Sequence, residues 1–133
     1  MRKLTIKSTK VPWVELLIHL FILLFFLKLA YTNWLMINHA VPPGGSVGWR
    51  TEAVLAKGEE IWYLANEHAG RAMFVATTLG ILSLLAGIVF LLRSPGKTGF
   101  YVVGSVVLAV GFLVLGYTYV ALTLPKIPGG EGG

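Results

Sequence analysis

Three long apolar stretches set the pattern of the sequence. The first covers residues 11–37 and the third covers residues 99–124, while the second contains 21 consecutive uncharged residues from 72 to 92. At about 1.5 Å per residue, 21 helical residues extend about 31 Å, which matches a hydrocarbon core of about 30 Å. The pattern predicts an all-α polytopic membrane protein with three transmembrane helices.

The polar segments predict how these helices are joined. Polar residues fill the stretch before Ala72, so the second helix is expected to cover residues 60–92, with an interfacial N-terminal part and a membrane core at 72–92. The run Arg93-Ser94-Pro95-Gly96-Lys97 is a tight-turn signal, which makes the second and third helices an antiparallel hairpin. The glycine-rich tail, residues 129–133, is expected to be disordered. All 133 residues form one membrane domain.

Composition supports lipid as the solvent. Hydrophobic residues make up 56% of the chain and charged residues 13%, about half the charged share of a soluble protein. The net charge of +5 fits an anionic membrane surface rather than nucleic acid, because four basic residues stand just before the first span: Arg2, Lys3, Lys7 and Lys10. Absence of cysteine excludes disulfides and thiolate metal sites.

Charge and aromatic residues also predict placement in a cell membrane. With three spans, the N-terminal tail and the hairpin turn together hold six Lys and Arg, and the opposite side holds four. The positive-inside rule therefore favours a cytoplasmic N-terminus in the plasma membrane. Trp13 lies near one end of the first span and the pair Tyr31/Trp34 near the other, as in the aromatic belts of membrane helices.

The most unusual segment is the polar stretch from residue 48 to residue 71. On a helix, Trp62, Asn66 and Gly70 stand at i, i+4 and i+8 and share one face, while Glu67 and Arg71 form an i, i+4 pair. An asparagine facing lipid would lose hydrogen bonds, so this face is expected to pack against another helix or the preceding loop. Two interpretations remain open, a packed interfacial helix or a platform that docks a ligand or partner.

The same segment resembles the SdpI family of small integral membrane proteins. The matching residues are Gly48-Trp49-Arg50-Thr51 and, after the expected spacing, a helix with Trp62, three residues, Asn66, three residues and Gly70. The resemblance covers about residues 47–122. It implies a short member with this three-span fold, acting in immunity to a secreted peptide toxin or in membrane-tethered signalling. The candidate partner-binding or structural residues of this segment are Gly48, Arg50, Thr51, Glu60, Trp62, Asn66, Glu67, Gly70 and Arg71.

Two charged residues call for partners. Arg50 with Thr51 is expected to form a latch, because a guanidinium beside the bilayer can grip Glu60 or Glu67 in a bidentate pair. Lys28 is an intramembrane charge about nine residues, or about 13 Å, from the end of the first span. It either extends to the membrane surface beside a thinned bilayer or forms an ion pair with a carboxylate of the second helix.

The remaining residue types give no basis for an enzyme. The three histidines, His19, His39 and His68, have no metal-ligand spacing, and only His19 lies at depth, so neither a metal nor haem is expected. Ser83 and Ser105 have no base beside them in sequence and are expected to bond to their own helices. Gly80 with Gly87, and Gly104 with Gly111, predict faces for helix packing within the bundle or for a homo-oligomer.

The sequence thus predicts a non-enzymatic protein without cofactors that contacts membrane lipids and binds a peptide or protein partner through residues 48–71. An alternative is an accessory subunit of a larger membrane complex of the respiratory type.

Overall fold

The computed structural model describes residues 11–43, 48–49 and 58–124 and contains three long helices. Helix α1 covers Trp13–Ile37, α3 covers Glu59–Arg93 and α4 covers Thr98–Thr123; the short 3-10 helix η1, Pro95–Lys97, joins α3 to α4. All three long helices are long and apolar enough to cross a membrane. The described chain is therefore an all-α, three-helix fold of the membrane type, as the sequence predicts.

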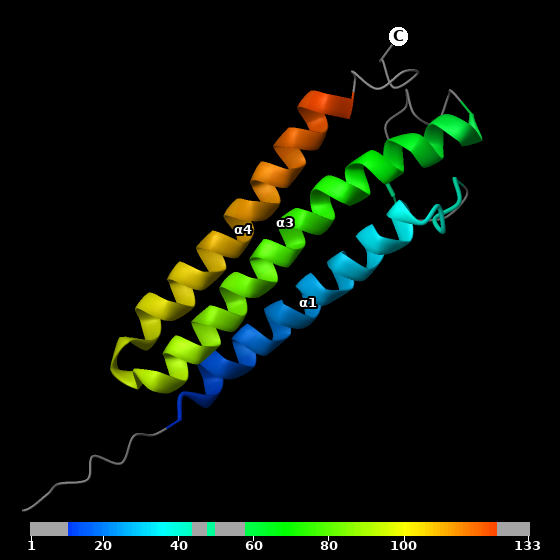
Figure 1. Ribbon diagram of the computed structural model, residues 1–133. Helices are drawn as coiled ribbons and strands as arrows, with labels where there is room; N and C mark the ends of the chain where they lie inside the picture. Colours follow the sequence, from blue (N-terminus) through cyan, green and yellow to red (C-terminus); the bar gives the residue numbers. More distant parts are fainter. Residues whose placement is uncertain (1–10, 44–47, 50–57, 125–133) are drawn as a thin grey trace, which may run out of the picture.

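Helix α3 lies between the other two helices. Figure 1 shows α1 and α4 on opposite sides of α3, and both pack along it while touching each other little. The start of α1 and the α3–α4 turn lie at one end of the bundle, which we call the turn end. The end of α1 and the start of α3 lie at the other end, which we call the loop end (Figure 1).

Local sequence explains where each helix stops. After Ile37 the backbone of His39 turns into the left-handed region at φ 55°, and the Ala40 N–H donates to the Leu35 carbonyl at 2.9 Å. The Asn38 side chain donates to the Trp34 carbonyl at 2.8 Å, so the last carbonyls of α1 are capped. Helix α3 starts after Gly58, also at positive φ, with the acidic residues Glu59 and Glu60 in its first turn. Carboxylates at that end oppose the positive end of the helix dipole.

Helices α1 and α3 pack in a constant antiparallel register. A Cβ on Gly70 would lie 3.0 Å from the Met36 Cβ, and a Cβ on Gly80 would overlap the Phe26 ring. A Cβ on Gly87 would lie 3.0 Å from the Nε2 of His19. From Gly70 to Gly87, the facing residue on α1 moves back by as many positions as α3 moves forward. Glycine at these three positions lets the two helices approach closely over their full shared length.

Glycines on α4 behave differently from one another. A Cβ on Gly116 would lie 2.6 Å from the Ala76 Cβ, so this glycine seats α4 against α3. By contrast, a Cβ on Gly104 or Gly111 would meet no atom within 4 Å. The expectation that Gly104 and Gly111 form a packing face inside the bundle was therefore wrong. Helix α4 packs against the bundle on one side, and neither glycine closely contacts α3, although Gly104 lines a hollow between α3 and α4.

Candidate functional site

Trp62 is the centre of the motif segment. Its side chain is 1% exposed, and its indole Nε1–H donates to the Val41 carbonyl at 2.7 Å. It belongs to an apolar cluster at the loop end, together with Met36, Val41, Ala65, Ala69, Val120 and Leu124. A buried indole needs a partner for its N–H, and here that partner is the loop backbone just after α1. Trp62 thus fastens the loop to α3 while it fills the loop-end core.

Asn66, one turn later, fixes the loop a second time. Its Oδ1 accepts a hydrogen bond from the Trp49 N–H, and its Nδ2 donates to the Trp62 carbonyl at 2.9 Å. Gly48 has φ 120°, and a Cβ there would lie 2.8 Å from the Trp62 ring and 2.9 Å from Asn66 Oδ1. Both the backbone angle and the space require glycine. Gly48, Trp62 and Asn66, separated in sequence, therefore meet at one point.

Gly70 completes the face by admitting α1. A Cβ at this position would lie 2.9 Å from the backbone oxygen of Asn33, an atom that cannot move without α1. The prediction that Trp62, Asn66 and Gly70 pack against protein is confirmed in the described residues: all three are buried. Trp49 connects these residues to α4, because the centroid of its ring lies 5.0 Å from that of Tyr117.

Glu67 lies on the neighbouring face and binds both His39 and Arg71. Its Oε2 accepts a hydrogen bond from His39 Nε2 at 2.7 Å, and its Oε1 accepts from Arg71 Nη2 at 2.7 Å and Nε at 3.1 Å. The His39 ring stacks on Tyr63 at 5.3 Å. Hydrogen bonds from His39 first, and then from Arg71, hold the pKa of Glu67 below its ordinary value. This cluster ties the end of α1 to α3 outside the core segment 72–92.

The other predicted motif residues divide into two groups. Glu60 is exposed in the first turn of α3, as is Glu59. Arg50 and Thr51 lie outside the described residues, as does the tail 129–133, so the latch stays a prediction. Of its two candidate carboxylates, Glu67 already binds His39 and Arg71.

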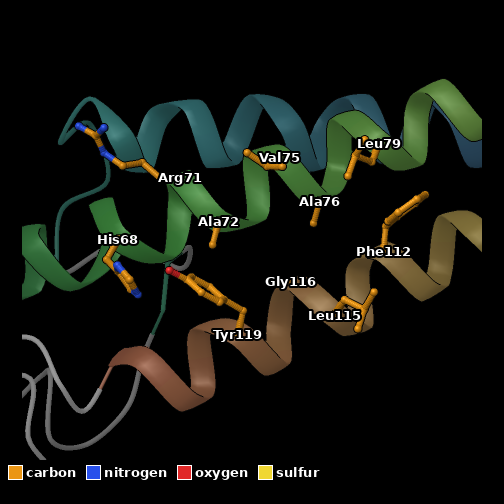
Figure 2. Close-up of a pocket in the computed structure, with 10 residues that line it drawn as sticks. All are labelled: His68, Arg71, Ala72, Val75, Ala76, Leu79, Phe112, Leu115, Gly116 and Tyr119. Carbon is orange, nitrogen blue, oxygen red and sulfur yellow. The ribbon is translucent and has the colours of Figure 1, made fainter.

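A groove opens between α3 and α4 beside this region (Figure 2). It has a volume of about 600 Å³, and its walls are apolar except at the loop end, where His68, Arg71 and Tyr119 lie. His68 Nε2 is hydrogen-bonded to Thr123 Oγ1 at 2.6 Å, and its ring stacks on Tyr119. Figure 2 shows the Arg71 guanidinium directed away from the hollow, toward α1. The groove is thus a notch in the lipid-facing surface rather than a closed polar pocket.

A buried polar pair lies near the turn end. His19 is fully buried, and its Nε2 is hydrogen-bonded to Ser105 Oγ at 2.6 Å across the Gly87 backbone. Ser105 Oγ also donates to the Tyr101 carbonyl at 2.7 Å, which confirms the predicted bond to its own helix. As expected, no base stands beside Ser105 in the sequence. In the fold, however, the base His19 contacts it from 86 residues away. This pair is a polar contact between α1 and α4.

Sequence reasoning missed the partners of the motif. Nothing in the spacing pointed to Val41, because the carbonyl of any loop residue can accept the Trp62 N–H. The sequence indicates that His39 does not lie at depth, but its bond to Glu67 depends on the left-handed turn after α1. In the described residues, no three His, Asp or Glu side chains gather closely enough to hold a metal ion.

No model of a known protein family, no curated protein and no solved structure matches the chain.

Proposed function

We propose that the chain is a non-enzymatic, SdpI-like integral membrane protein that binds a peptide or protein partner at its loop end. The observation that carries this proposal is the node of Gly48, Trp62 and Asn66. These three residues of the SdpI-like motif, from the loop and from α3, meet in one hydrogen-bonded and closely packed arrangement. Motif residues far apart in sequence thus share one physical task, which is to set the shape of the membrane-surface segment.

The partner surface is the outer side of this segment. Because Trp62, Asn66 and Gly70 are buried, they cannot touch a partner directly, and they act by holding the first turns of α3 against Val41, Trp49 and α1. The accessible residues around them are Glu59, Glu60, Leu64, Glu67 and Arg71. A rigid surface loses little conformational entropy on binding, which favours recognition of a flexible peptide. Such a surface would serve either immunity to a secreted peptide toxin or membrane-tethered signalling.

Orientation decides which compartment the partner occupies. We propose a plasma-membrane protein with a cytoplasmic N-terminus, from the six-to-four distribution of basic residues. The loop end would then face outward, where a secreted peptide arrives. Cysteines introduced at Ser46 and Gly132 should react with an impermeant maleimide in intact cells, and protection of both would reverse the orientation.

Site-directed photocrosslinking in the native membrane tests the partner surface. A benzophenone amino acid at Leu64, which is 42% exposed at the loop end, should crosslink to a discrete peptide or protein. The same group at Val103, exposed near the turn end, is the control and should give lipid adducts only. Asn66→Leu should abolish the Leu64 crosslink, because the loop loses its anchor. Lipid adducts alone at Leu64 would contradict the proposal.

A second candidate is an accessory subunit of a larger membrane complex. Helix α4 favours it, because Gly104 and Gly111 leave open space beside this helix that a neighbouring transmembrane helix could enter. Native mass spectrometry of protein released in mild detergent separates the two. A stoichiometric set of other membrane subunits, or a homo-oligomer that loses its contacts on Gly111→Leu, would favour assembly through α4 over the loop-end surface.

A further inference from the structure

The register between α1 and α3 fixes the depth of Lys28. Met36, Phe26 and His19 face Gly70, Gly80 and Gly87, so Ala72, where the uncharged core of α3 begins, is level with Trp34. The ring of Trp34 stacks on Tyr31 and both are exposed, as expected of an aromatic belt at the membrane boundary. Lys28 lies six residues before Trp34 on α1, so its Cα lies about 9 Å deeper in the membrane than that boundary.

Lys28 faces outward at this depth. Its residue is exposed, and so are Leu24 and Tyr31 on either side of it, whereas the face of α1 that meets α3 carries Phe26, Asn33 and Met36. In the part of the chain that the structure describes, the ion pairs of Glu67 are with His39 and Arg71, and none reaches Lys28. The ion pair with α3 that the sequence allowed is therefore not formed among these residues.

The direction of the side chain makes the position harder to hydrate. Helical side chains lean toward the N-terminus of their own helix, and the nearer membrane surface lies toward the C-terminus of α1. The lysine must therefore bend back against this lean to reach water or lipid headgroups. Charged residues at such depth normally face the interior of a bundle or pair with an opposite charge. A partner for an outward-facing one can come only from outside the chain.

We propose that Lys28 marks an intramembrane docking site for a transmembrane helix of another protein that carries an Asp or Glu at the same depth. The apolar residues Leu17, Phe21, Leu24 and Tyr31 surround it on the outer face of α1 and are all exposed. With Lys28 they repeat every three or four residues, the spacing of a helix-packing seam. One charged position within an apolar seam gives such a contact its specificity and its register.

A second parallel copy of this chain does not fit the site. Among the described carboxylates, Glu15 lies thirteen residues from Lys28 on α1, which is about 20 Å along the axis. Glu59, Glu60 and Glu67 lie above the level of Trp34 in the same register. The partner is therefore a different chain, and the site is separate from the loop-end surface, so either proposal can fail without the other.

Model transmembrane peptides provide a defined test. The full chain, carrying a donor dye at its C-terminus, is reconstituted in nanodiscs with an acceptor-labelled leucine–alanine peptide that has one Glu about 9 Å below its tryptophan anchor. The matched peptide has Gln instead. Energy transfer should report tighter association with the Glu peptide by about three- to thirtyfold, the range of polar contacts between membrane helices.

Charge variants decide the assignment. Lys28→Gln should remove the preference for the Glu peptide, and Lys28→Glu should transfer it to a peptide with Lys at that depth. Arg93→Gln, at the end of α3, should leave the preference unchanged, and circular dichroism should show equal folding of all variants. Equal binding of Glu and Gln peptides by the unsubstituted chain would overturn the proposal. Binding of anionic lipids that depends on Lys28, without any difference between the Glu and Gln peptides, would overturn the proposal too. That result would assign Lys28 to a lipid phosphate.

Discussion

The loop end and the membrane interior hold the same three helices together by different means. At the loop end, Trp62 donates a hydrogen bond to loop backbone and Asn66 accepts one from it, while Glu67 accepts hydrogen bonds from His39 and Arg71. In the interior, the helices meet where Gly80 admits Phe26 and Gly116 admits Ala76. Lipid gives helices no hydrophobic reason to associate, so close packing has to supply the attraction there.

This difference predicts which substitutions each region tolerates. The loop end borders water, so its core combines apolar burial with polar partners, and removal of a large side chain should cost most. The interior depends on the absence of side chains, so addition of atoms should be harmful there. The predictions below test this contrast.

Trp62→Ala should have the largest effect. It removes a 1% exposed aromatic side chain from the loop-end cluster and leaves the Val41 carbonyl without its donor. Truncation of a buried aromatic residue costs about 3–5 kcal/mol. The free energy of unfolding in detergent micelles measures the loss. Trp34→Ala, at a residue that is 50% exposed, is the control and should change it little; equal losses would refute the central role of Trp62.

Gly80→Leu should destabilise the interior by about 1–3 kcal/mol, because the added side chain must displace the buried Phe26 ring. Gly111→Leu adds the same atoms to α4 where no described atom lies within 4 Å of the Cβ. It should be neutral or slightly stabilising, since leucine favours helix more than glycine does. Thermal unfolding of the two variants checks the contrast, and similar losses would show that both glycines are packed.

The sequence was sufficient for the helices but not for the contacts between them. An uncharged stretch as long as a bilayer is thick, flanked by Pro and Gly, leaves few alternatives to a spanning helix, so all three appeared near their expected bounds. Periodicity also placed Trp62, Asn66 and Gly70 on one buried face. It could not show that Gly87 is closely packed and Gly104 is not. A spanning helix is apolar on all sides, so no polar face marks which side meets lipid.

Long-range polar pairs were beyond sequence reasoning for a related reason. His19 and Ser105 meet because two registers, α1 on α3 and α3 on α4, bring them to the same level beside Gly87. Each register results from the packing of many small residues. No single spacing in the sequence encodes it.

The His19–Ser105 pair should show a smaller effect than the glycine. Ser105→Ala removes one partner of a fully buried imidazole, and a lost buried hydrogen bond costs about 1 kcal/mol. A double-mutant cycle with His19→Leu isolates the pair, and the coupling should be about 0.6 kcal/mol, the average for hydrogen bonds between membrane helices. Ser83→Ala is the control, because the Ser83 hydroxyl bonds to the Leu79 carbonyl of its own helix. A coupling of zero would mean that the pair does not join α1 to α4.

The smallest effect concerns the pH dependence of the loop end. Hydrogen bonds from His39 and Arg71 hold the pKa of Glu67 in the folded chain below its ordinary value of 4.5. A carboxylate with a depressed folded pKa stabilises the fold above the unfolded pKa, and that contribution is lost as the pH falls through the folded pKa. Wild-type thermal stability should thus fall more steeply than that of Glu67→Gln between neutral pH and acid below 4.5, with the two curves converging at low pH. His39→Ala should show an intermediate slope, because it removes the largest cause of the shift and keeps Arg71. Parallel curves for the wild type and Glu67→Gln would show that the cluster does not stabilise the loop end.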